Sequence, residues 1–261
     1  MRLQYASDIH LEKSPKKTYE ELLTPVAPVL VFLGDICLLQ DTHLHSFFEW
    51  CSERWETVLW IPGVLEIWGS GFSDVDTGVS AMRAAVSPFA NVHVLFCETM
   101  GSEDGVILLG CPLWRRPCDD VMLHVTGPIW AKADPTPTEK KVFLREYLRC
   151  LKFLESEIKA TRTPIVVLSH YAPLPWLTEE EWIQPPEYAT NVPELEVLLR
   201  PPVVAWLFGH CHVPTVERHT WTSATGKENT VLLTSNPRAG EDYRKDAVLR
   251  IDPTRYGETI N

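Results

Sequence analysis

The sequence predicts an α/β protein with a largely parallel sheet, and two observations support this. Short apolar runs recur along the 261 residues, and each is rich in Val, Ile or Leu, as strands buried on both faces are. Between several of these runs lie stretches with helical spacing, and such alternation is typical of α/β folds. No composition shift, repeat or linker divides the chain, so we expect a single domain over residues 1–261.

The predicted strands are the apolar runs of about strand length. They are RLQYA (2–6), VLVFL (29–33), TVLWI (57–61), VHVLF (92–96), VILLG (106–110), IVVLS (165–169), VVAWLF (203–208), VLLTS (231–235) and AVLRI (247–251).

Three segments are predicted to be helices. Residues 43–55 follow Asp41 and Thr42, either of which could cap a helix. Residues 142–160 carry apolar side chains at three- and four-residue intervals, and residues 192–200 end before two prolines. Segments 112–138 and 171–190 are irregular and rich in Pro and Trp. For these two, functional loops and plain surface connections remain equally open.

Composition excludes several classes of protein. The net charge of −11 argues against a general nucleic-acid or anionic-membrane surface. No run is long and apolar enough to span a bilayer, so no membrane partner is expected. Seven scattered cysteines without a Cys-x-x-Cys pair suit reduced thiols, and the start of the chain has no signal-peptide core. We therefore expect a cytoplasmic protein.

Polar side chains follow four of the predicted strands. In open α/β sheets the carboxyl ends of the strands converge on the ligand crevice, so these side chains should form a metal site. Imidazole and carboxylate without thiolate suit Mn, Fe or Zn, and a carboxylate such as Asp35 can bridge two ions. Cys211, between two such histidines, should point away. The candidate ligands are Asp8, His10, Asp35, His170, His210 and His212.

These motifs resemble those of the calcineurin-like metallophosphoesterases, and the resemblance covers most of the chain. It rests on SDIH (7–10), LGDI (33–36), LSHYAP (168–173), FGHCH (208–212) and NPR (236–238). The resemblance implies a four-layer α-β-β-α sandwich with two mixed sheets and a dinuclear metal site at the strand ends.

The resemblance also implies a role for each ligand. One ion would take Asp8, His10 and His212, and the other would take His170 and His210, with Asp35 bridging both. A metal-bridging hydroxide would be the nucleophile. We expect two divalent ions, Mn in the first place and Fe or Zn as alternatives. The residues assigned to catalysis are Asp35, His170 and Glu66.

The chain departs from the family in the stretch WIPGVLEIWG. The family motif reads Gly-Asn-His-Glu or Gly-Asn-His-Asp, whereas this chain has Gly63, Val64, Leu65 and Glu66. In the family the Asn ligates the second metal and the His contacts the substrate phosphate, so we expect a weakened second site and a slowed enzyme. Glu66 is expected to orient a metal ligand.

Phosphate-binding candidates are Arg238, in the NPR motif, and Arg115, because guanidinium matches phosphate bidentately. His43, His45 or His124 could take over the missing histidine's role, although exposed loop histidines are the simpler interpretation.

Three hypotheses follow. The first is an attenuated metal-dependent phosphoesterase acting on a small phosphodiester or phosphomonoester, and the acidic charge argues against a long nucleic acid as its partner. The alternative is a catalytically degenerate protein of this fold that binds a protein partner. The third is that Val64 and Leu65 were introduced deliberately in place of Asn and His.

Overall fold

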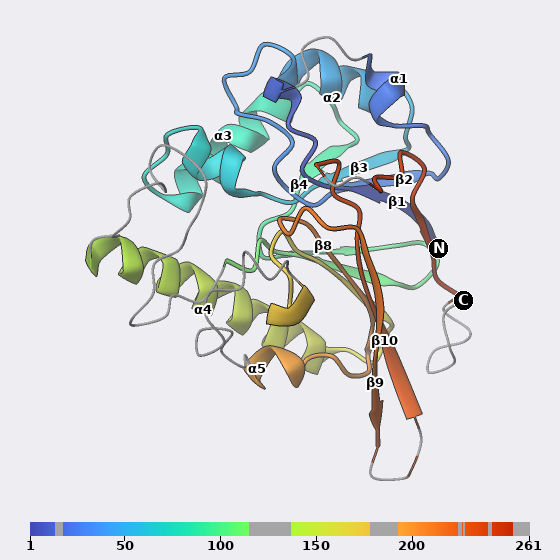
Figure 1. The fold of residues 1–261 in the computed structure, drawn as a ribbon. Helices are drawn as coiled ribbons and strands as arrows, with labels where there is room; N and C mark the ends of the chain where they lie inside the picture. The colour runs from blue at the N-terminus through green and yellow to red at the C-terminus, as the bar shows by residue number, and fades with distance from the viewer. Residues whose placement is uncertain are drawn as a thin grey trace.

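The computed structural model describes residues 1–13, 18–114, 137–177, 193–223, 226, 228–239 and 242–252. Within these residues the chain forms two β-sheets, with helices on their outer faces (Figure 1). The first sheet has the order β11-β1-β2-β3-β4. Its strands are β1 (Arg2–Ala6), β2 (Val29–Phe32), β3 (Thr57–Trp60), β4 (Val92–Val94) and β11 (Val248–Arg250).

The second sheet has the order β5-β6-β7-β8-β10-β9. Its strands are β5 (Glu98–Gly101), β6 (Ile107–Gly110), β7 (Ile165–Leu168), β8 (Val203–Phe208), β9 (Thr215–Thr222) and β10 (Glu228–Ser235). In both sheets the central strands pair in parallel, while β11, β5 and β9 pair antiparallel at the edges. Both sheets are therefore mixed.

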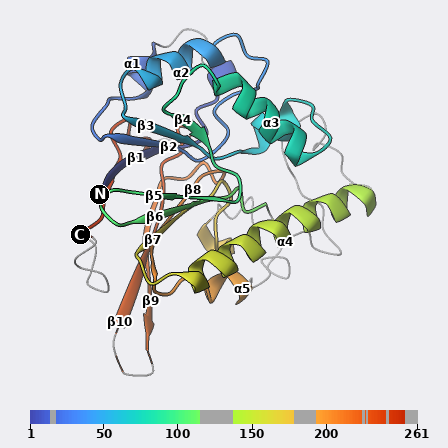
Figure 2. The same ribbon diagram turned by 180° about the vertical axis from the view of Figure 1, so that it is seen from behind.

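Helices cover the outer faces of the two sheets. The first three lie over the first sheet and the last two beside the second, as the opposite view confirms (Figure 2). The α-helices are α1 (Tyr19–Leu22), α2 (Leu44–Ser52), α3 (Val75–Val86), α4 (Pro137–Ala160) and α5 (Pro193–Glu196), with single helical turns of other types at η1 (Leu11–Lys13), η2 (Leu65–Gly69) and η3 (Pro175–Leu177). The predicted four-layer sandwich is confirmed.

Side chains point alternately to the two faces of each strand, and those on the inner faces fill the space between the two sheets. Leu3 and Tyr5 of β1 and Val31 of β2 belong to one buried cluster with residues of the second sheet. Their neighbours Leu30 and Phe32 instead pack in the cluster under the helices. Because side chains two apart share a face, each strand serves both cores, which explains the apolar runs.

Each predicted strand is present, but two strands were missed. Strand β5 is mostly exposed, and β9 exposes Glu217 and Arg218 at the sheet edge, so neither carries an apolar run. Among the helices, α1 and α3 were not predicted, and α5 is shorter than the range 192–200. Among the described residues, no helix is long and apolar enough to cross a bilayer.

The start of α2 differs by a residue from the prediction. The carboxylate of Asp41 accepts hydrogen bonds from the backbone N–H of His43, at 2.8 Å, and from its Nδ1, at 2.9 Å. Asp41 thus closes a turn before the helix, and His43 occupies the N-cap position.

Candidate metal centre

The six candidate ligands lie where four parallel strands end. Strands β1 and β2 are neighbours in the first sheet, and β7 and β8 are neighbours in the second, so their carboxyl ends meet along one edge of each sheet. The structure brings the ligand atoms into two groups, each within 4.8 Å. The first group is Asp8, His10 and His212, and the second is Asp35, His170 and His210. Each group draws on both sheets.

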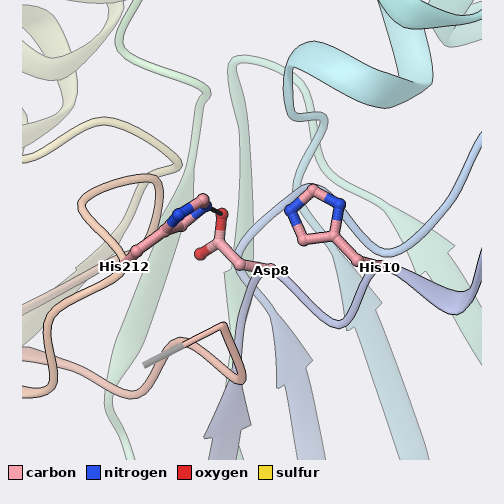
Figure 3. A group of neighbouring side chains, drawn as sticks. All are labelled: Asp8, His10 and His212. Atoms are coloured by element: carbon pink, nitrogen blue, oxygen red, sulfur yellow. Dashed lines mark ion pairs between the residues drawn. The ribbon is translucent and has the colours of Figure 1, made fainter. Parts of the chain in front are cut away.

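In the first group, Asp8 lies between the two imidazoles (Figure 3). Its Oδ1 is 3.4 Å from Nε2 of His212, and the rings of His10 and His212 lie edge to face at 5.7 Å. Oδ2 of Asp8 accepts the backbone N–H of His210 at 3.0 Å, which ties the first group to the second. The carboxylate of Asp8 is completely buried.

In the second group, Nε2 of His170 lies 3.6 Å from Oδ1 of Asp35. Nδ1 of His170 donates to the backbone carbonyl of Leu33 at 2.8 Å, which leaves the lone pair of the neutral ring on Nε2. Oδ1 of Asp35 also accepts the backbone N–H of Leu65 at 2.8 Å. The rings of His170 and His210 are 5.0 Å apart.

The two groups fit divalent ions. Three buried atoms of the six ligand side chains have no hydrogen-bond partner among the described residues: Oδ1 of Asp8, Nε2 of His10 and Nε2 of His170. Buried polar atoms without partners are costly, and natural proteins seldom leave them so. Two imidazoles and a carboxylate form a donor set that suits a transition-metal ion in each group.

The backbone at these ligands is strained. Five of the six have positive φ angles in the left-handed region. The angles are 52° at Asp8, 50° at His10, 55° at Asp35, 66° at His210 and 54° at His212. Asp and His tolerate this region better than most residues, and such strain concentrates at functional sites.

Electrostatics favour an ionised carboxylate in the first group. Burial raises the pKa of Asp8, but the close contact with His212 and the charges of His170 and His212 outweigh it and hold this pKa below the usual value. Burial acts to lower the pKa of His10, yet the hydrogen bond that its Nδ1 donates to Glu12 and the charges of nearby carboxylates raise it. A metal ion would compete with the proton of that imidazole.

Glu66 contacts the backbone around Asp35. Its buried carboxylate accepts N–H bonds from Gly63 at 2.9 Å, Asp35 at 3.0 Å and Ile36 at 2.7 Å. Burial and the charge of Asp35 raise the pKa of Glu66 to about 7. A Cβ at Gly63 would lie 2.4 Å from Oδ1 of Asp35, so this close approach requires glycine. Glu66 therefore joins the turn at Gly63 to the Asp35 loop.

The two residues that replace the family's Asn-His sit on that turn. Val64 is buried, and Leu65 begins η2, a single turn of π-helix. Leu65 contributes a backbone N–H to Asp35, but its side chain has no group that can ligate or donate a proton.

The remaining candidates are placed as follows. Arg238 lies beside the Asp8–His10 segment, where its Nη1 donates to the carbonyl of Ile9 at 3.0 Å. The thiol of Cys211 contacts the carbonyl of Val213 and lies outside both ligand groups. Arg115 and His124 lie outside the described residues.

Sequence reasoning missed Glu12, whose Oε1 lies 2.8 Å from Nδ1 of His10. The sequence feature that could have indicated this contact is a carboxylate two residues after a ligating histidine. The orientation of that carboxylate, however, depends on the turn η1.

Comparison with known proteins supports the fold. No protein-family model matches the chain. The uncharacterized protein L509 of Acanthamoeba polyphaga mimivirus is 22% identical over 236 residues, covering 80% of this chain and 84% of that protein. Phosphopantetheinyl hydrolase (PptH) of Mycobacterium tuberculosis is similar in structure, with a TM-score of 0.64 and 14% identity over 98% of each chain. The chain has the fold of the calcineurin-like metallophosphoesterase superfamily, and its two ligand groups lie at the strand ends.

Proposed function

We propose that this chain is a metal-dependent phosphoesterase that hydrolyses a small phosphodiester or an activated phosphomonoester. The observation that carries the proposal is the convergence of six ligand side chains in two groups, with three buried ligand atoms lacking hydrogen-bond partners among the described residues. The similarity to a solved phosphopantetheinyl hydrolase supports a hydrolase of phosphoesters.

Each group would hold one divalent ion, and Asp35 would contact both. When bound, such ions polarise phosphoryl oxygens and lower the pKa of water. Mn is the metal we expect, with Fe or Zn as alternatives. His10 and His170 offer their Nε2 atoms because Glu12 and the carbonyl of Leu33 accept the protons on Nδ1.

The chain's own residues set the limits of this chemistry. Glu66 fixes the backbone of Asp35, and Arg238 would bind the substrate phosphate beside the Asp8–His10 segment. Leu65 cannot donate a proton to the leaving oxygen, so no acid at this position assists the departure of that oxygen. Substrates with acidic leaving groups, such as aryl esters, should therefore react fastest.

The test is Mn-stimulated hydrolysis of an aryl phosphodiester and an aryl phosphomonoester by the full chain and by the Asp35→Asn variant. The proposal expects hydrolysis that a chelator abolishes and that the variant loses. Hydrolysis that neither the chelator nor Asp35→Asn reduces would refute it.

The alternative is a binding protein that has kept the fold but lost the chemistry. Val64 and Leu65 in place of two polar residues favour it. This alternative expects a chain that binds metal without hydrolysing either ester, and that retains a protein partner in pull-down when Asp35 is replaced.

A further inference from the structure

We infer that Glu12 is a positioning residue for the first metal site: it holds His10 with Nε2 facing Asp8 and His212, and it makes this site the tighter of the two. The inference rests on the metal centre of the proposed function. It concerns affinity for the ion and not hydrolysis.

The contact between His10 and Glu12 fixes the tautomer of the neutral imidazole. Nδ1 of His10 lies 2.8 Å from Oε1 of Glu12, and a carboxylate oxygen only accepts hydrogen bonds. The proton of the neutral ring therefore lies on Nδ1 and the lone pair on Nε2. That Nε2 is buried, has no hydrogen-bond partner among the described residues and faces the ligand atoms of the first group.

The local fold holds Glu12 in this place. Leu11 is buried and donates its backbone N–H to the carbonyl of Ile36 at 2.9 Å, and Lys13 donates to the carbonyl of His10 at 3.0 Å. The turn η1 is thus anchored on both sides of Glu12. With only a fifth of its side chain exposed, Glu12 is directed at His10 rather than at solvent.

In the second group, His170 has no such carboxylate behind it among the described residues. Nδ1 of His170 donates to the neutral backbone carbonyl of Leu33. A carboxylate behind a ligating imidazole raises the basicity of the ligand atom, and losing such a partner costs about 10- to 100-fold in metal affinity. The difference in partners therefore predicts two unequal sites.

A second histidine–carboxylate pair provides the matched control. Nδ1 of His43 lies 2.9 Å from Oδ1 of Asp41, but neither residue belongs to a ligand group. Asp41→Ala removes the same kind of hydrogen bond without touching the candidate centre.

The experiment titrates the metal-stripped full chain with Co²⁺ and follows its visible absorption. The wild type should bind in a tight and a weak phase. Glu12→Ala should weaken the tight phase by about 10- to 100-fold and leave the weak phase unchanged. Glu12→Gln, whose amide oxygen still accepts from Nδ1, should recover part of the loss, and Asp41→Ala should match the wild type.

Equal tight-phase affinity in Glu12→Ala and the wild type would overturn the inference, as would equal weakening of both phases. If Glu12→Ala does not fold, an unchanged tight phase in Glu12→Gln overturns it instead. A wild type that binds no Co²⁺ overturns both this inference and the metal centre. Selective weakening without any ester hydrolysis supports the inference and removes only the proposed function.

Discussion

The two ligand groups are alike in composition and different in their surroundings. Each consists of a carboxylate and two imidazoles drawn from both sheets. In the first group, the carboxylate of Glu12 accepts a hydrogen bond from His10. In the second group, the backbone carbonyl of Leu33 accepts one from His170, and Asp35 contacts the turn that carries Val64 and Leu65. The strand ends deliver both groups, and the residues around them determine how firmly each would hold an ion.

Completing the second group should have the largest effect. Val64→Asn with Leu65→His restores an amide oxygen and an imidazole, and a positioned acid contributes about a hundred- to ten-thousandfold in rate. We expect Mn-dependent hydrolysis of an alkyl phosphodiester, whose leaving oxygen needs that acid, to rise within that range, and hydrolysis of an aryl phosphodiester to rise less. A double variant no faster than the wild type would show that these two positions do not limit the rate.

Removing the carboxylate of Asp35, which in the proposed function would contact both ions, should act on both groups at once. Asp35→Asn keeps the shape of the side chain but removes its charge, and we expect hydrolysis to fall by about a hundred- to a thousandfold. Initial rates at saturating Mn²⁺ measure the loss. Replacing the exposed Asp104 in the same way should leave the rate unchanged.

Loss of Glu66 should destabilise the chain near the second group. Glu66→Ala leaves three backbone N–H groups without their acceptor, at about 1 kcal/mol each, so the free energy of unfolding should fall by about 3 kcal/mol. Urea denaturation of the metal-stripped chain measures this change. Glu98→Ala, at an exposed ion pair with Arg83, should cost less than about 1 kcal/mol, and an equal loss in both variants would contradict the prediction.

Metal binding should stabilise the whole fold, because each group joins the two sheets. At a metal concentration a hundred times the dissociation constant, we expect the free energy of unfolding to rise by about 2.7 kcal/mol. Urea denaturation with Mn²⁺ and with chelator gives the difference. His212→Asn should remove the greater part of it if the first site is the tighter one, and His210→Asn the smaller part.

The sequence predicted the strands and the ligands for the same physical reason. Strands buried on both faces are apolar throughout, so a polar residue such as Asp8 or His170 is conspicuous where the strand stops. Edge strands such as β9 lack this contrast because one side meets solvent. Helix α3 was not predicted because it contains Gly78, a residue that disfavours helices and that packs closely against Ile67 here.

The surroundings of the ligands were harder to predict. The hydrogen bond between Glu12 and His10 depends on the turn η1, and the three N–H bonds to Glu66 join two loops distant in sequence. Local sequence patterns report neither contact. Whether Arg238 binds phosphate stays a prediction, although its place beside Ile9 agrees with that role.

Because the backbone at five of the ligands is left-handed, the choice of substitution matters when the contribution of each ligand is measured. At Asp8 or His212, alanine would remove a ligand and also place a side chain with little tolerance for positive φ in that conformation, at a cost on the order of 1 kcal/mol. An alanine scan would add this conformational penalty at five of the six ligands and overstate what the metal contributes there. Asparagine accepts the left-handed region, so asparagine variants separate the two effects. His170 has no positive φ, so alanine there reports the ligand alone.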